Sequence, residues 1–166
     1  QRARLFNEVR ARSRQLESLS RIEAGLSLAT TEEEILLALA GGPPWSEPPV
    51  LELAYLMTRA VDGALLAEAV SRVEGEAVGR PPGGPQTLSA LPLSALWLER
   101  PRELLVVEDA TADPRLDAAA RAQLRREGRP ALVILPLRRG GQWQGVLRLS
   151  WPAAHRLSVD ELFVLQ

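Results

Sequence analysis

Asp109, Asp113 and Arg115 are the residues of this 166-residue chain whose types and spacing come nearest to a chemical site. Two carboxylates close in the chain can act as a general acid and base where a cleft separates their pKa values. The guanidinium of Arg115 can hold a phosphate or a carboxylate through its fork of donors. Each residue also has a structural interpretation: Asp113 before Pro114 can cap a helix, and Arg115 can pair with Asp109 or Glu108. Because nearness in the chain alone joins the two carboxylates, we do not expect an enzyme.

The composition excludes most covalent and metal chemistry. The chain has no cysteine and one histidine, and all 20 of its basic residues are arginine. Disulfides, thiolate catalysis, cysteine-held metals, lysine Schiff bases and histidine-rich metal sites are therefore excluded. The 21 acidic residues balance the arginines, which argues against a general nucleic-acid surface. No uncharged stretch reaches the ~20 apolar residues of a membrane-spanning helix, so we expect no membrane insertion and a cytoplasmic location.

The first 29 residues are predicted to form a separate signalling or dimerisation helix. Its apolar residues recur at alternating spacings of four and three, the heptad pattern of coiled coils. The seam comprises Leu5, Val9, Arg12, Leu16, Leu19, Glu23 and Leu26, so two charged residues interrupt it. The alternative is an amphipathic helix that packs on its own domain.

Residues 30–166 are predicted to form one α+β domain. Capping-box spacings at Thr31 and Ser158 predict the starts of two helices. Period-two alternation predicts two hairpins, over 50–74 and 132–151, with tight turns at Asp62-Gly63 and Gly140-Gly141. Between them we expect a helix at 89–99, a strand at 104–107 and a helix that Asp113 caps and that runs to Glu127. The predicted fold is a central antiparallel sheet of about five to six strands flanked by helices.

The same alternation predicts that each hairpin has one buried face and one face in water. In the last hairpin Trp143, Gly145, Leu147, Leu149 and Trp151 share the buried face, with Arg148 on the wet face. In the first hairpin the same pattern places Arg72 in water.

Three phrases, in this order and spacing, resemble the GAF domain, with PAS as a related architecture. They are the stretch 105–115, which passes from a strand through an acidic residue into Asp-Pro-Arg, the hairpin around Pro136 and Gly145, and Leu157-Ser158-Val159-Asp160-Glu161-Leu162. The resemblance covers residues 28–166. GAF domains are sensor modules of bacterial signalling proteins such as multi-sensor histidine kinases of two-component systems.

The resemblance implies a ligand pocket and a route for signals. It places the ligand between one sheet face and the segment 93–115, where Trp97, Asp109, Asp113 and Arg115 are candidates. The candidate floor residues are Tyr55, Ala69, Ile134 and Leu149. It also implies a homodimer through the terminal helices, at Leu5, Val9, Leu16, Leu19 and Leu26, and neighbouring signalling domains after a truncated C-terminal linker helix. Trp97 has the alternative of a core residue, and the whole chain that of a ligand-free structural or dimerisation domain.

The sequence departs from the GAF subclasses with known ligands. A covalent bilin needs a cysteine and the Asn-Lys signature of cyclic-nucleotide GAF domains needs a lysine, and the chain has neither. Haem or iron needs several histidines, and the chain has one. We therefore expect no covalent cofactor and no metal, and a non-covalent small molecule of unknown identity as the ligand.

Overall fold

The computed structural model describes residues 2–43, 45–91, 93–100 and 102–165. Helices and strands alternate along the chain in nearly the predicted order. They are α1 (Arg2–Leu28), α2 (Glu32–Gly41), β1 (Val50–Thr58), β2 (Leu65–Glu74), β3 (Ala77–Gly79), β4 (Gln86–Thr87), the 3-10 turn η1 (Leu88–Ala90), α3 (Ser94–Glu99), β5 (Leu105–Val107), α4 (Ala118–Glu127), β6 (Ala131–Arg139), β7 (Gln142–Trp151) and α5 (Val159–Val164).

The strands form one antiparallel sheet, as predicted. Over the described residues its order is β3-β2-β1-β7-β6-β5, with β4 paired to β2 outside this path. The two predicted hairpins are β1–β2 and β6–β7, and β1 pairs with β7 to join them at the centre. Gly63, Gly140 and Gly141 have φ of 70°, 57° and 82° at the tips, a conformation that favours glycine.

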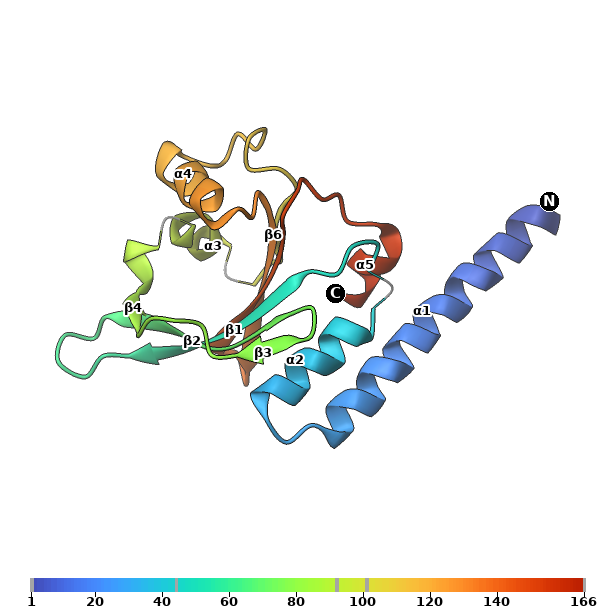
Figure 1. The fold of residues 1–166 in the computed structure, drawn as a ribbon, viewed down its shortest axis with the longest axis horizontal. Coiled ribbons are helices and arrows are strands. Elements are labelled where there is room, and N and C mark those ends of the chain that lie inside the picture. The colour runs from blue at the N-terminus through green and yellow to red at the C-terminus, as the bar shows by residue number, and fades with distance from the viewer. Residues whose placement is uncertain (1, 44, 92, 101, 166) are drawn as a thin grey trace.

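Helices α2 and α5 cover one side of the sheet, which we call the closed face (Figure 1). Its core includes Leu36 of α2, Leu51 of β1, and Leu149 and Trp151 of β7, each at most 1% exposed. The indole nitrogen of Trp151 donates to the carbonyl oxygen of Glu47 at 2.8 Å, so its one polar atom is paired. The largest side chains of this face are therefore almost completely removed from solvent.

Helix α5 is held to the closed face by a buried carboxylate. Glu161 is 0% exposed and accepts hydrogen bonds from the amide and hydroxyl of Ser46, both at 3.0 Å, and from the amide of Ser158 at 2.7 Å. His155 stacks on Trp151, and its Nε2 lies 3.4 Å from Glu161 Oε1. Burial opposes ionisation of Glu161, but the hydrogen bonds from Ser158 and Ser46 outweigh it and lower its pKa. The Ser158 capping box is confirmed.

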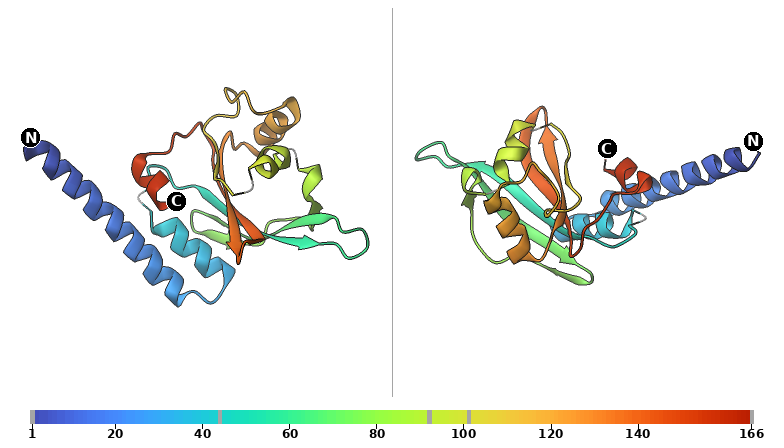
Figure 2. Two further views of the ribbon diagram at one scale, coloured as in Figure 1. Left: turned by 180° about the vertical axis from the view of Figure 1, so that it is seen from behind. Right: turned by 90° about the horizontal axis from the view of Figure 1, so that it is seen from above.

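The other side of the sheet, the open face, lies beneath η1, α3 and α4 (Figures 1 and 2). The predicted start of α4 is wrong. The helix begins at Ala118, and its cap is Asp117, whose carboxylate accepts the Ala120 amide at 2.7 Å. Asp113 instead accepts the backbone amide of Arg115, two residues later, which closes a turn before the helix. Helix α3 also begins later than predicted, at Ser94.

Two β-bulges decide which side chains reach the open face. Val70 on β2 and Gln144 on β7 have no opposite residue, because the register shifts between Leu53 and Ala54 and between Leu137 and Arg138. Each extra residue reverses the alternation of facing beyond it.

The prediction that Trp143 shares a face with Trp151 is therefore wrong. Trp143 packs against the core of the open face and stacks on Trp97, with ring centroids 4.7 Å apart. Trp151 belongs to the closed face.

Helix α1 packs on α2 and α5 and then extends past the domain (Figures 1 and 2). A narrow strip of it faces the body: Ser18 is 3% and Ile22 8% exposed. The contact is close, because a Cβ on Gly42 would lie 2.1 Å from a side-chain atom of Ile22, and one on Gly25 2.7 Å from Ala38. Among the described residues, no helix has the length and apolar character needed to cross a membrane.

Candidate ligand-binding cavity

The open face contains a cavity of about 430 Å³, within the range that holds small-molecule ligands. Strands β1, β2, β6 and β7 form its floor, η1 and α3 one wall, and α4 with the loop at 81–84 the rest. Its main lining residues are Glu52, Ala54, Ala67, Ala69, Arg72, Leu88, Leu91, Leu93, Trp97, Gln123, Glu127, Arg129, Ile134, Val146 and Arg148.

A row of charged side chains crosses one end of the floor. Glu52 on β1 lies directly opposite Arg72 on β2 and Arg148 on β7. Arg72 donates to Glu74 at 2.8 Å, and this hydrogen bond is the main cause of a lowered pKa at Glu74. Arg148 forms an ion pair with Glu127 of α4. Both guanidiniums therefore turn away from Glu52, whose carboxylate has no hydrogen bond or ion pair with any described residue.

The other end of the cavity is apolar and wide. Two residues along from the charged row, Ala54 of β1 lies opposite Ala69 of β2 and Val146 of β7. The bulge at Val70 is what places Ala69 on this face. Alanine side chains end at Cβ, so the floor is low here, and Leu88 and Trp97 close the space from the wall side. The cavity thus joins a charged end to an apolar end.

Three buried polar atoms around the cavity lack hydrogen-bond partners among the described residues. They are the indole nitrogen of Trp97, the side-chain oxygen of Gln123 and Nε of Arg148. A buried donor or acceptor without a partner costs about 1–3 kcal/mol. Native proteins pair most such groups. Ser71, Arg121 and His155 also have an unpartnered buried atom, so three of the six such atoms among the described residues belong to residues that line the cavity.

The structure brings three of the predicted pocket residues together. Ala69, Trp97 and Ile134 all line the cavity. Tyr55 and Leu149 do not, and their assignment to its floor is corrected. The hydroxyl of Tyr55 donates to Glu32 of α2 at 3.1 Å. The pKa of Tyr55 is raised mainly by burial and, to a smaller extent, by the Glu32 carboxylate. Leu149 is 1% exposed in the core of the closed face.

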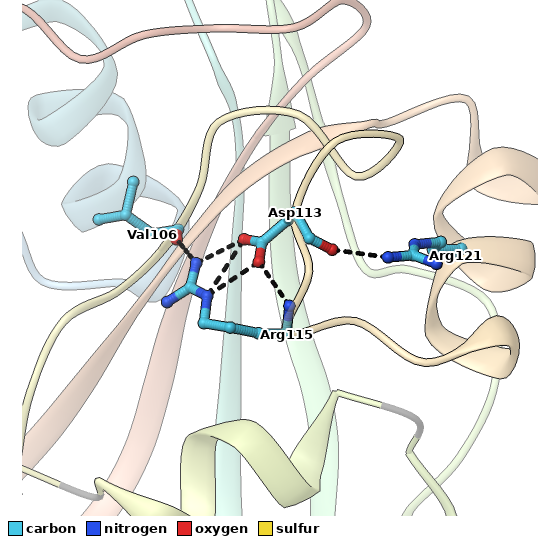
Figure 3. A network of polar contacts seen from close by, with 4 residues as sticks. All are labelled: Val106, Asp113, Arg115 and Arg121. Atoms are coloured by element: carbon cyan, nitrogen blue, oxygen red, sulfur yellow. Dashed lines mark hydrogen bonds and ion pairs between the residues drawn. The ribbon is translucent and has the colours of Figure 1, made fainter.

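The acidic loop is a self-contained turn outside this cavity. Asp109 accepts the hydroxyl and amide of Thr111 at 2.7 and 2.8 Å, and these two bonds lower its pKa. Figure 3 shows that the Arg115 side chain binds the Asp113 carboxylate and the carbonyl oxygen of Val106. Neither aspartate lines this cavity.

Arg115 lines a second hollow, of about 410 Å³, together with Trp97 and Leu105. Its donors are already engaged by Asp113, which also raises the pKa of Arg115. The arrangement stabilises the loop before α4, where Arg121 donates to the carbonyl oxygen of Asp113 at 2.8 Å.

Glu52, Arg72, Gln123 and Arg148 were not recognised from the sequence. The alternation predicts that Arg72 and Arg148 lie in water, whereas both line the cavity. A signal was present: β1, β2 and β7 each carry a charged residue among apolar ones, at positions that pair across the sheet. This signal can be recognised only when the pairing register of the strands is known. The register of β1 with β2 includes the bulge at Val70, which the sequence does not predict.

No protein-family model matches the sequence, and no curated protein matches it. Solved structures do match the fold. The phycocyanobilin-bound GAF domain of a cyanobacterial phytochrome is 17% identical over 91% of this chain and 89% of its own, with a TM-score of 0.63. The GAF domain of a phosphoenolpyruvate-protein phosphotransferase from Coxiella burnetii is 17% identical over 92% and 87%, with a TM-score of 0.59. That of a two-component sensor histidine kinase from Bacillus halodurans is 12% identical over 82% and 87%, with a TM-score of 0.57. The chain therefore has the GAF-domain fold.

Proposed function

We propose that this GAF-fold domain is a non-catalytic sensory module of a multidomain bacterial signalling protein, in the manner of a cytoplasmic sensor histidine kinase. It binds a small molecule non-covalently in the cavity of the open face and relays binding through α1 and α5. The cavity, with its unpartnered polar atoms, is the observation that carries the proposal. Because the 166 residues contain no cysteine, the proposed ligand is not one held by a thioether bond to this segment.

The second part of the proposal is a homodimer through α1. Leu5, Val9 and Leu16 are 57%, 66% and 55% exposed, and Leu19 and Leu26 are 38% and 39% exposed. Ser18 and Ile22, which face the rest of the domain, each lie one position before a residue of the heptad seam. The apolar stripe of the seam therefore faces a different direction from the side of α1 that packs on the domain. A second copy of the same helix would cover it as a coiled coil.

The relay has a physical basis in the contacts of the two terminal helices. Gln15 of α1 donates to Asp160 of α5 at 3.1 Å, and the Arg12 guanidinium lies 5.9 Å from the Phe163 ring. Strand β7 contributes Arg148 to the cavity, and its last residue, Trp151, stacks on His155 just before α5. Occupancy of the cavity can therefore shift the population of α1–α5 arrangements.

The binding test is thermal unfolding of the protein with a metabolite panel of nucleotides, amino acids, organic acids and aromatic compounds. A binder raises Tm in a saturable way. The Ala69→Trp variant fills the cavity, and Ala60→Trp adds the same side chain at an exposed position between β1 and β2. We expect the ligand to raise the Tm of the parent and of Ala60→Trp, but not that of Ala69→Trp. Equal shifts in Ala69→Trp contradict the assignment of the cavity.

The dimer test is sedimentation velocity over a range of protein concentrations. Leu16→Glu places a charge on the stripe, whereas Ala24→Glu places the same charge on an exposed position away from it. We expect a dimer for the parent and Ala24→Glu and a monomer for Leu16→Glu. A parent that stays monomeric at high concentration contradicts this part.

A second candidate function is a ligand-free dimerisation domain. The observation that favours it is Trp97, which is 3% exposed and stacked on Trp143 as a core residue would be. Under this alternative the metabolite panel leaves Tm unchanged, while the dimer test gives the same result.

A further inference from the structure

The charged end of the cavity has one uncompensated charge of each sign. Arg72 and Arg129 both pair with the single carboxylate of Glu74, which leaves one positive charge in excess there. Arg148 is matched one to one by Glu127. Glu52 has no ion pair with any described residue and supplies the uncompensated negative charge.

Glu52 and Arg72 are neighbouring residues on the cavity floor, although the Arg72 guanidinium turns toward Glu74. Glu52 and Arg72 are direct cross-strand partners, and the Cβ atoms of such partners are about 4.5–5.5 Å apart. The alanine row lies two residues further along the strands, about 7 Å away at ~3.3 Å per residue. A ligand that matches this floor carries adjacent positive and negative groups and an apolar body of several carbons.

We propose that the cavity binds a free α-amino acid with a large apolar side chain, as its zwitterion. The inference rests on the proposed function and names the ligand class of that site. The ammonium group faces the Glu52 carboxylate. The carboxylate faces the Arg72–Arg129 pair. The side chain lies over Ala54, Ala67 and Ala69.

Ligands of a single charge fit this floor less well. A phosphate or a simple carboxylate satisfies the arginines but leaves the Glu52 carboxylate unpaired beside the new anion. An organic cation satisfies Glu52 and leaves the excess guanidinium charge. A half-buried charge is costly unless it is paired. A zwitterion pairs both Glu52 and the excess guanidinium charge, so it is favoured over an anion or a cation alone.

The test is isothermal titration calorimetry of the protein with four probes. L-phenylalanine carries all three recognised groups. N-acetyl-L-phenylalanine lacks the ammonium, L-phenylalaninamide lacks the carboxylate, and glycine lacks the side chain. We expect saturable binding of L-phenylalanine and a loss of at least about tenfold in affinity for each of the other three. Binding of the N-acetyl or amide form as tight as that of L-phenylalanine overturns the proposal, and so does no binding of L-phenylalanine.

Two matched variants locate the ammonium site. Glu52→Gln removes the floor carboxylate, and Glu76→Gln makes the same change at an exposed residue outside the cavity. We expect Glu52→Gln to weaken L-phenylalanine binding by at least about tenfold and Glu76→Gln to leave it unchanged. Circular dichroism confirms that both variants are folded. Unchanged binding by folded Glu52→Gln overturns the assignment.

The panel experiment separates this inference from the function on which it rests. If nucleotides or organic acids shift Tm in the parent and not in Ala69→Trp, while amino acids do not, the sensory cavity stands and the amino-acid assignment fails. If no class of compound shifts Tm, both fail.

Discussion

The two faces of the central sheet differ in how completely their side chains fill the space beneath the helices. On the closed face Leu36, Leu51, Leu149 and Trp151 interlock under α2 and α5, and even the indole nitrogen is paired. On the open face small alanines and a charged row leave about 430 Å³ beneath α3. The same strands contribute to both faces, because successive side chains along a strand point to opposite sides of the sheet. The open face also has a packed core, which includes Leu124 and Leu132 at 0% exposed, but the cavity lies on this face.

This division makes different predictions for substitutions on the two sides. The largest loss is expected at the centre of the closed face. Trp151→Ala removes a 1%-exposed side chain together with its hydrogen bond to Glu47 and its stacking on His155. We expect about 3–5 kcal/mol less stability in urea unfolding. A loss below about 1 kcal/mol would show that this face is not the principal core.

The contact between α1 and α2 is expected to respond to a single methyl group. Gly42→Ala places a Cβ 2.1 Å from a side-chain atom of Ile22, so either this side chain or the helix must shift. We expect a loss of about 1–3 kcal/mol and faster amide hydrogen exchange in α1 near Ile22. Gly41→Ala is the matched control, since a Cβ there meets nothing within 4 Å. Equal losses in the two variants would refute a steric cause.

Glu161 is expected to make the closed face sensitive to acid. The pKa of Glu161 is lowered from 4.5 in the folded protein. Its contribution to the stability of the fold is therefore complete above the pKa of the unfolded chain and is lost as the pH falls through the folded pKa. Glu161→Gln should therefore cost about 1–3 kcal/mol at pH 7 and less below pH 4. Urea unfolding from pH 3 to pH 7 measures this difference. A difference that does not change with pH contradicts the role given to the ionised carboxylate.

The smallest effect is expected on the cavity floor of the open face. Ala69→Leu enlarges a side chain into open space, so we expect stability to change by less than about 1 kcal/mol. The same variant should weaken binding of any cavity ligand. Thermal unfolding with and without ligand separates the two effects. A large loss of stability would mean that the cavity floor is close-packed.

The sequence predicts the order of elements well, because their signals are local. Both capping boxes, the glycine turns and the glycine after α4 lie where the chain pattern indicates. The start of α4 was misplaced because Asp113 and Asp117 are equally good caps in sequence, and the interaction of Asp113 with Arg115 decides between them.

The site was only partly predictable, for a different physical reason. Ala69, Trp97 and Ile134 follow from the resemblance to GAF domains, but Tyr55 and Leu149 were assigned to the wrong face. A bulge of one residue reverses facing, and nothing in the sequence marks Val70 or Gln144 as unpaired. Glu52, Arg72 and Arg148 come together only through pairing across three strands.

The most direct test of the division between the faces is calorimetric titration of L-phenylalanine into two variants. Ala69→Trp fills the open face, and Tyr55→Phe removes a hydroxyl on the side of α2. We expect that Ala69→Trp abolishes saturable binding and that Tyr55→Phe binds as the parent does. Binding that survives in folded Ala69→Trp, or that is lost in Tyr55→Phe, would contradict this expectation.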